Sequence, residues 1–313
     1  MKRFFIIIFS LLFFAIHSFA QDCYSDNRSQ GVAAYNNGKY AEAKKYFQSA
    51  QNCDMKPRQN DVADWIGKCD EKLKTAVVQG ALNGVFSVSP TQKVVFSKGN
   101  LQYRASTNTW RFAEHQYDII VIDEANKNIS STYNGWIDLF GWGTSGYNGR
   151  KPYLNPEELL ILKESISKTN YDLGVYNAIS NGGNTKGLWR TLTYSEWNYL
   201  IHLRNNASKK WGTAYINGVG VWGVIVLPDN WNSPHGVSFI SGTAIHKYSI
   251  QEWIMMEKNG AIFLPDLYYW SGTVGNAGYA GALRAWSTNV DVCFPDITGS
   301  YSKYYVRLVK NVN

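Results

Sequence analysis

Apolar residues follow helical spacing directly behind a well-formed helix start in the second half of the chain. Thr193 and Glu196 stand three residues apart, so the hydroxyl oxygen and the carboxylate can each accept a backbone N–H of the first turn. Trp197, Leu200 and Ile201 then recur on one side of the helix. The pattern predicts a short capped helix that packs on a larger body, with structural roles for Thr193, Glu196 and Trp197.

A second capping box has the same form further along the chain. Ser249 and Glu252 precede Trp253, which lies on the apolar side of another short predicted helix. Apolar runs over residues 219–227 and 261–264 flank this helix, and each ends in Pro-Asp, as strands often do. The region therefore predicts a helix set between two strands.

Residues 83–125, which precede both predicted helices, have the pattern of β-strands. Short apolar runs are separated by Gly-Asn and by Ser, Thr and Asn, which are typical hairpin residues. The predicted strands cover residues 85–88, 93–97, 101–104 and 109–112. Residues 304–309 alternate as a half-buried final strand does, and residues 156–168 predict a short surface helix. We expect an α+β fold with short strands and long polar, aromatic loops.

Residues 24–73 are helical in pattern. Small and aromatic residues there follow a spacing that resembles a tetratricopeptide repeat: Gly31, Gly38, Tyr40, Ala43, Phe47 and Ala50. A third helix, beginning at Asp61, is expected to cover the helix pair. One repeat buries little apolar surface, so stabilisation by a disulfide or by docking is expected. The resemblance implies a protein partner for residues 21–75.

Cysteines are concentrated in this helical segment. Cys23 begins the first predicted helix and Cys53 ends the second, so an antiparallel hairpin brings them to the same end. We predict a Cys23–Cys53 disulfide, with Cys69 as the competing partner of Cys53. Metal binding by these thiols is disfavoured because no Cys-x2-Cys spacing occurs.

The first twenty residues have the composition of a secretory signal peptide. Lys2 and Arg3 precede an apolar run, and small residues stand at the expected cleavage positions before Gln21. The expected organisation is a signal peptide (1–20), a tetratricopeptide-like domain (21–75) and a larger domain (76–313). No other stretch has the length and hydrophobicity of a membrane span. We expect an exported protein of the periplasm, cell surface or extracellular space.

The charge of the chain argues against nucleic-acid binding. Removing the leader lowers the number of basic residues from 31 to 29 against 24 acidic residues, a net charge of +5. The basic residues are scattered along the chain, so no basic patch is predicted.

The segment Arg190-Thr191-Leu192-Thr193-x-x-Glu196-Trp197 resembles the Arg-Leu-Pro-Thr-x-x-Glu-Trp signature of formylglycine-generating-enzyme-like domains. These domains, also called sulfatase-modifying factors, are a branch of the C-type lectin fold. The closing residues 306–309 are similar to the family's terminal Phe-Arg strand. Further similar motifs stand in order at residues 96–101, 138–147, 176–183 and 269–273. The resemblance covers residues 84–309 and is greatest for exported, paralogue-rich bacterial members.

The resemblance implies that catalysis would need two cysteine thiolates near the C-terminus, which bind copper(I) in active family members. This chain has only Cys293 there, so formylglycine-type oxidation is disfavoured and no catalytic residue is assigned. Cys293 is expected to be a buried small apolar residue between Val292 and Phe294.

Candidate metal and acid–base residues are scattered. His115, His202, His235 and His246 lack the spacing of metal ligands. Asp138 with Glu196, or Asp291 with Asp296, could be posed as a glycosidase carboxylate pair, but Glu196 caps its helix and the others are expected to be surface charges. Asp229 is expected at a strand-end turn. No cofactor is predicted, although oxygen-rich loops leave room for a structural calcium ion.

Binding is the remaining function. In C-type lectin folds the loops before the last strand form the ligand face, and the matching stretch here is residues 270–304. Its candidate contact residues are Trp270, Tyr279, Arg284, Trp286, Asp291, Asp296 and Tyr301. Tyr, Trp and Arg supply large contact areas at low entropic cost. We expect a non-catalytic envelope protein that recognises a glycan or protein. The alternatives are an enzyme of this fold with unfamiliar chemistry and a structural envelope component.

Overall fold

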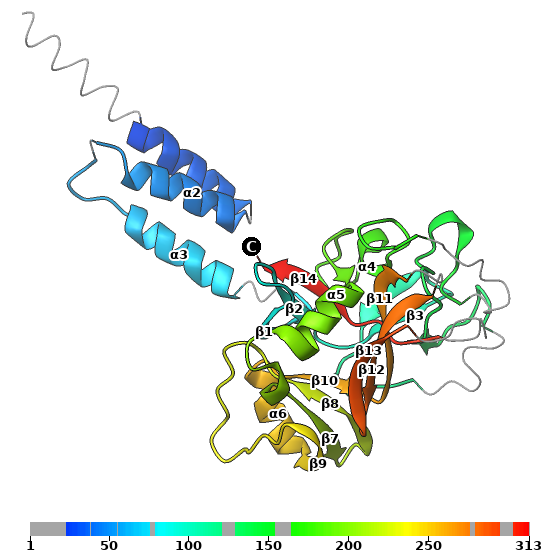
Figure 1. Ribbon diagram of the computed structural model, residues 1–313. Coiled ribbons are helices and arrows are strands. Elements are labelled where there is room, and N and C mark those ends of the chain that lie inside the picture. The colour runs from blue at the N-terminus through cyan, green and yellow to red at the C-terminus, as the bar shows by residue number, and fades with distance from the viewer. Residues whose placement is uncertain are drawn as a thin grey trace, which may run out of the picture. The chain divides into compact units, whose positions relative to one another are not determined.

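The computed structural model describes residues 23–37, 39–54, 56–75, 79–120, 129–153, 164–275, 279–294 and 303–312. The chain divides into two compact units, Met1–Val77 (unit 1) and Val78–Asn313 (unit 2). Helices occur in both units and strands only in unit 2 among these residues, so the α+β class is confirmed (Figure 1). The expected boundary between residues 75 and 76 lies two residues before this division. The predicted signal peptide lies outside the described residues.

Unit 1 consists of three helices over residues 23–36, α2 (Tyr40–Gln51) and α3 (Val62–Thr75). Phe47 of α2 is fully buried, and its ring stacks on Trp65 of α3 with centroids 5.4 Å apart. A Cβ atom at Gly31 would lie only 2.6 Å from the Phe47 ring, so glycine is required where the first two helices meet. This close contact explains the small residues of the helical motif.

The predicted disulfide is confirmed. Cys23 and Cys53 are bonded, with Cα atoms 6.2 Å apart, and Cys69 is a free, buried thiol. Arg28 of the first helix also pairs with Asp61 just before α3, and its Nε lies 2.7 Å from the carboxylate. Unit 1 is thus cross-linked covalently and by an ion pair.

Unit 2 contains four small sheets in its described part. The first has the order β1 (Ala81–Ser87), β2 (Lys93–Ser97), β14 (Leu308–Val312) and β6 (Arg190–Thr191). The second has the order β10 (Ile262–Pro265), β8 (Val221–Val226), β7 (Trp211–Asn217) and β9 (Gly242–Ser249). The third is β11 (Leu267–Val274), β12 (Ala280–Trp286) and β13 (Asn289–Cys293), and the fourth is β4 (Thr109–Phe112), β3 (Leu101–Arg104) and β5 (Trp136–Ile137). All pairings are antiparallel except that of β7 with β9.

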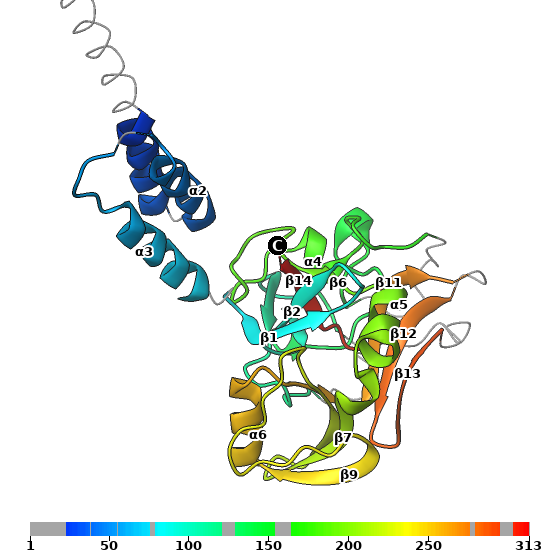
Figure 2. The ribbon, with the colours of Figure 1, turned by 60° about the vertical axis from the view of Figure 1, so that its left-hand side comes forward.

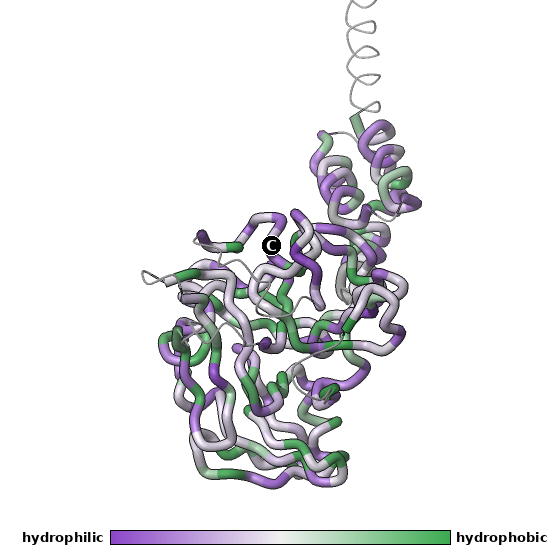
Figure 3. The backbone as a smooth tube through the Cα atoms, turned by 90° about the vertical axis from the view of Figure 1, so that its right-hand side faces the viewer, coloured by the Kyte–Doolittle hydropathy of each residue, from purple (hydrophilic) through white to green (hydrophobic). Residues whose placement is uncertain are grey.

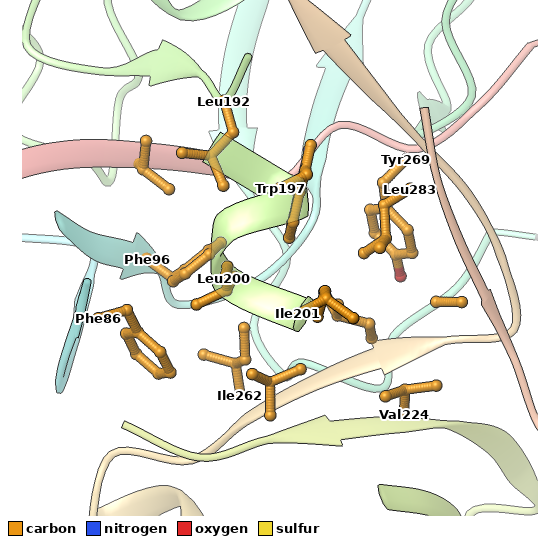
Figure 4. Packing of buried hydrophobic residues seen from close by; sticks show 14 of the residues in the cluster. Phe86, Phe96, Leu192, Trp197, Leu200, Ile201, Val224, Ile262, Tyr269 and Leu283 are labelled. Atoms are coloured by element: carbon orange, nitrogen blue, oxygen red, sulfur yellow. The ribbon is translucent and has the colours of Figure 1, made fainter. Parts of the chain in front are cut away.

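Helix α5 (Tyr194–Asn198) lies between the first and third sheets and continues as a π-helical turn, η3 (Tyr199–Leu203). The predicted capping box is present, with Thr193 Oγ1 accepting from the Glu196 N–H at 3.2 Å. Figure 4 shows Trp197, Leu200 and Ile201 pointing into the core formed by both sheets and by strands β8 and β10. The predicted apolar stripe therefore organises the main core of unit 2.

A second core lies under the β4-β3-β5 sheet and is rich in tryptophan. The buried indoles of Trp142, Trp189 and Trp270 each donate a hydrogen bond of 2.7 Å to a backbone carbonyl. The fully buried Asp172 accepts from the backbone N–H groups of Gly174 and Thr191, which caps the one-turn helix α4 (Leu173–Tyr176) and ties it to β6. These buried contacts fix the glycine-aromatic loops.

Helix α6 (Ile250–Lys258) has the second predicted capping box, Ser249 with Glu252. Its Trp253 is buried against Phe263 of β10, and the helix follows directly after β9 (Figure 2). The remaining short elements are the 3-10 turns η1 (Tyr147–Gly149) and η4 (Ala207–Lys209).

Two predicted elements differ from the structure. Residues 164–168 are not helical, which is contrary to the end of the predicted 156–168 helix, and residues 154–163 lie outside the described part. Of residues 304–309, Tyr304 and Tyr305 form isolated bridges and the strand itself starts at Leu308. All six residues are buried, so the expected alternation of a half-buried strand is absent. No helix of the described residues is long and apolar enough to cross a membrane, and Figure 3 shows hydrophobic and hydrophilic positions interspersed along the chain.

Candidate functional site

Three of the predicted contact residues lie together on one face of the β12–β13 hairpin. Arg284 faces Asp291 in register, and Trp286 faces Asn289 next to the turn. Because alternate side chains of a strand point to the same side, Arg284, Trp286 and Asp291 share a face. Leu283, Ala285 and Val290 point to the opposite side and are buried in the main core. Figure 2 shows this hairpin along one side of unit 2.

The hairpin face combines charge with an aromatic ring. The Arg284 guanidinium lies 5.2 Å from the centroid of the Trp286 ring, and its Nη2 lies 3.6 Å from Asp291 Oδ2. Trp286 is 39% exposed. The buried Nε of Arg284 donates to no atom of the described residues. The face offers hydrogen-bond donors, an acceptor carboxylate and an accessible apolar ring.

Two residues that the sequence analysis did not assign complete this face. The Tyr268 ring packs edge-on against Trp286 with centroids 5.6 Å apart, and His202 Nε2 lies 3.8 Å from Asp291 Oδ1. Alternation along β11 could have indicated Tyr268, because it pairs with Arg284. His202 comes from η3, so only the tertiary fold reveals its position.

The prediction that Trp270 is a contact residue is wrong. Trp270 is 2% exposed, and its indole donates to the Phe140 carbonyl in the tryptophan-rich core. It shares the strand face of Arg284, but Phe140 and Tyr304 cover that end of the sheet. Tyr279 is half-buried at the opposite end of β12 from Trp286. Asp296 and Tyr301 lie outside the described residues.

Cys293 is half-buried, which corrects the expectation of full burial. It faces Ala282 on the edge strand β13, where packing is incomplete. Burial nevertheless raises the pKa of its thiol. The neighbouring Phe294 stacks on Tyr194 with centroids 4.4 Å apart. Cys293 is the one free thiol in the described part of unit 2, so no thiol pair is formed there.

The expectation that Asp138 is a surface charge is also wrong. Asp138 is 1% exposed and accepts a 2.8 Å hydrogen bond from the Ile120 N–H. Burial raises the pKa of this carboxyl to about 7. Asp138 does not pair with Glu196, whose carboxylate accepts hydrogen bonds from Thr193 and Arg190.

The described acidic residues form no evident metal site. No group of three or more His, Cys, Asp or Glu side chains is placed to hold a metal ion within the described ranges. Asp229, the strand-end aspartate, accepts from the backbone and hydroxyl of Ser87 and lies 3.5 Å from the Arg204 guanidinium. Its oxygens therefore join β1 to the loop after β8.

Comparison of the chain with protein-family models, curated proteins and solved structures finds no match. The function must therefore be argued from the residues themselves.

Proposed function

We propose that this protein is an exported, non-catalytic binding protein of the bacterial cell envelope. In this proposal unit 2 recognises a glycan or protein through the hairpin face formed by Arg284, Trp286 and Asp291. The observation that carries the proposal is the exposed Trp286 ring beside an arginine with an unused buried donor. Aromatic and arginine side chains of this kind dominate recognition surfaces.

We further propose that unit 2 has the formylglycine-generating-enzyme-like form of the C-type lectin fold. The support comes from the signature at residues 190–197, whose threonine and glutamate form a capping box beside strand β6. The hairpin precedes the last strand in the chain, as the ligand loops do in the resembling family. A single free thiol in the described part of unit 2 supports a binding role over the family's copper chemistry.

Unit 1 is proposed to be a tetratricopeptide-like adaptor that contacts another protein. The support is the helix pair with glycine against Phe47 at its crossing, followed by a covering third helix. Export is supported by the composition of residues 1–20 and by the Cys23–Cys53 bond, which is expected in an oxidising compartment.

The test is binding of the purified full chain to an array of envelope and host glycans, and to candidate envelope proteins one at a time. The expected result is a ligand whose affinity falls at least tenfold in Arg284→Ala and Trp286→Ala. Trp222→Ala is the matched control, because Trp222 is an equally exposed tryptophan on β8. Unchanged binding by folded Arg284→Ala and Trp286→Ala, or equal loss in Trp222→Ala, would reject the hairpin face as the site.

A further inference from the structure

A second concave surface lies on the outer side of the β4-β3-β5 sheet. The residues that line it are distant in sequence from the β12–β13 hairpin. The surface is an open depression with a volume of about 740 Å³, within the usual range of small-molecule sites. The strands, the segment after β4 and the turn between β7 and β8 supply its walls: Gln102, Arg111, Tyr117, Asp118, Ile119, Ile120, Tyr133, Trp136, Val219 and Val221.

The strand register gathers two arginines around one tryptophan: Arg111 and Trp136 line this pocket, and Arg104 lies beside it on the same indole. Arg111 of β4 faces Gln102 of β3, and Arg104 of β3 faces Trp136 of β5. These four side chains therefore share the outer face of the sheet. Leu101 and its alternating neighbours point inward to the tryptophan-rich core.

Both guanidinium groups lie against the indole of Trp136. The Arg111 Cζ atom is 3.9 Å and the Arg104 Cζ atom 4.3 Å from the ring centroid. A guanidinium that contacts an aromatic ring in this way keeps its in-plane N–H donors free for a planar anion. The ring therefore holds two cations together without itself using their N–H donors.

Neither arginine has a carboxylate partner within ion-pair distance among the described residues. Arg111 donates from Nε to Gln102 Oε1 at 2.8 Å, and the buried Nε of Arg104 has no partner in that part of the chain. Burial lowers the pKa of Arg111 from its ordinary value. The nearby Glu114 pairs with Lys98 at 3.0 Å, and its charge also acts on Arg111 to raise the pKa, so it offsets part of the positive charge of the two arginines.

The rest of the pocket narrows the class of anion. Asp118 lines it and can accept hydrogen bonds from hydroxyl groups, while Tyr117 and Tyr133 supply aromatic surface for C–H groups. Two arginines, offset by Asp118 and in part by Glu114, leave at most one net positive charge, which suits a singly charged ligand better than a polyphosphate. Trp136 is already covered by guanidinium groups, which disfavours stacking of a nucleobase on it.

We infer that this pocket binds an acidic saccharide, whose carboxylate or sulfate is held by the guanidinium donors of Arg111, while Arg104 on the same indole adds positive charge beside the pocket. Asp118 accepts from the sugar hydroxyls, and the tyrosines contact the sugar ring. This site is separate from the proposed hairpin face and does not depend on it.

The test is isothermal titration calorimetry of the full chain with three disaccharides: one with a uronic acid, one with a sulfate ester and a neutral counterpart. At least one acidic disaccharide should bind at least tenfold more tightly than the neutral one, and more weakly as salt rises. The carboxylate and sulfate arms identify which acidic group is preferred. Arg111→Gln should lose at least tenfold in affinity, and Arg104→Gln and Arg111→Lys should each lose less.

Lys186→Gln is the matched control, because Lys186 lies 4.7 Å from the centroid of the Tyr176 ring and away from the pocket residues. Arg284→Ala should also retain the affinity, which separates this site from the hairpin face. Circular dichroism identifies any variant that fails to fold. If Arg111→Gln fails to fold, the affinity of Arg111→Lys decides whether Arg111 binds the acidic group. Equal binding of neutral and acidic sugars, no binding of either acidic sugar, or tighter binding of ATP would overturn the inference. Unchanged affinity in folded Arg111→Gln would also overturn it.

Discussion

Arg190 and Glu196 form a two-contact ion pair at the start of helix α5, with nitrogen to oxygen distances of 2.7 and 2.8 Å. Both side chains are largely buried, at 13% and 12% exposure. The same carboxylate accepts from the Thr193 N–H at 2.8 Å, so one residue closes the capping box and also anchors β6. The box at Ser249 and Glu252 has no such arginine in the described part of the chain.

This difference predicts unequal costs for removing the two glutamates. Glu252→Ala should lower the free energy of unfolding by about 1 kcal/mol, the usual effect of losing a cap. Glu196→Ala should lower it by about 3 kcal/mol, because Arg190 is then left largely buried without a carboxylate to balance its charge. Urea unfolding of both variants at neutral pH measures the two costs. Equal costs would show that the ion pair adds nothing to the cap.

We expect the contribution of Asp138 to the free energy of unfolding to fall as the pH rises. Its pKa in the folded protein, about 7, lies above the ordinary value of 3.8. The contribution of protonated Asp138 to the free energy of unfolding is therefore fully present below about pH 4. It is lost as the pH rises through 7, because the buried carboxyl must then ionise. Asp138→Asn removes this ionisation, so its stability relative to the wild type should increase between pH 4 and pH 8 by about 2–4 kcal/mol.

Urea unfolding of the wild type and Asp138→Asn at a series of pH values checks this expectation. Asp118→Asn provides a control with a partly exposed carboxyl in the same region. A constant difference between Asp138→Asn and the wild type from pH 4 to pH 8 would contradict it.

We expect the contribution of Asp61 to the stability of unit 1 to have the opposite pH dependence. The hydrogen bonds from Arg28 lower the pKa of this carboxyl to about 2, from an ordinary value of 3.8. Its contribution is therefore present above about pH 4 and is lost as the pH falls through 2. Both side chains are more than a third exposed, so solvent screening limits the effect to less than about 1 kcal/mol.

Asp61→Asn should thus destabilise the helices slightly at pH 7 and have a much smaller effect at pH 2. Far-ultraviolet circular dichroism during urea unfolding follows these helices. Asp64→Asn serves as a control on the next turn of the same segment. A larger effect at pH 2 than at pH 7 would disprove the assignment.

The Cys23–Cys53 bond closes a loop with a sequence separation of 30 residues. Its removal in Cys53→Ser should lower the free energy of unfolding of unit 1 by about 3 kcal/mol, since the unfolded chain gains conformational freedom. Reducing agent should lower the stability of the wild type similarly and leave Cys53→Ser unchanged. Cys293→Ser, which removes a free thiol in unit 2, should respond to reductant as the wild type does. Identical unfolding curves for Cys53→Ser and the wild type would contradict this prediction.

Elements fixed by near neighbours in sequence could be predicted from the sequence. Both capping boxes involve residues three positions apart, and the β1–β2 and β3–β4 hairpins close through short turns. The partners of distant strands could not be predicted. Nothing local indicates that β9 pairs in parallel with β7.

The candidate site was predictable only in part, for the same reason. The resemblance selected Arg284, Trp286 and Asp291 from a stretch expected to be loops, whereas they lie on one face of strands β12 and β13. The sequence could not show how much of that face is covered. Trp270 lies on it and is buried because Phe140 packs there from far away in the chain. Asp138 reads as polar and is buried by the same kind of distant packing.

Strand β14 lies between β2 and β6, in the interior of its sheet. The sheet therefore cannot be completed during synthesis until residues 308–312 have emerged from the ribosome. The apolar core of the unit 1 helices is formed by residues between Tyr24 and Cys69, so it needs no such delay. The nascent chain thus carries an early-folding helical segment ahead of a longer segment that must wait, with its apolar strands exposed, for its final residues.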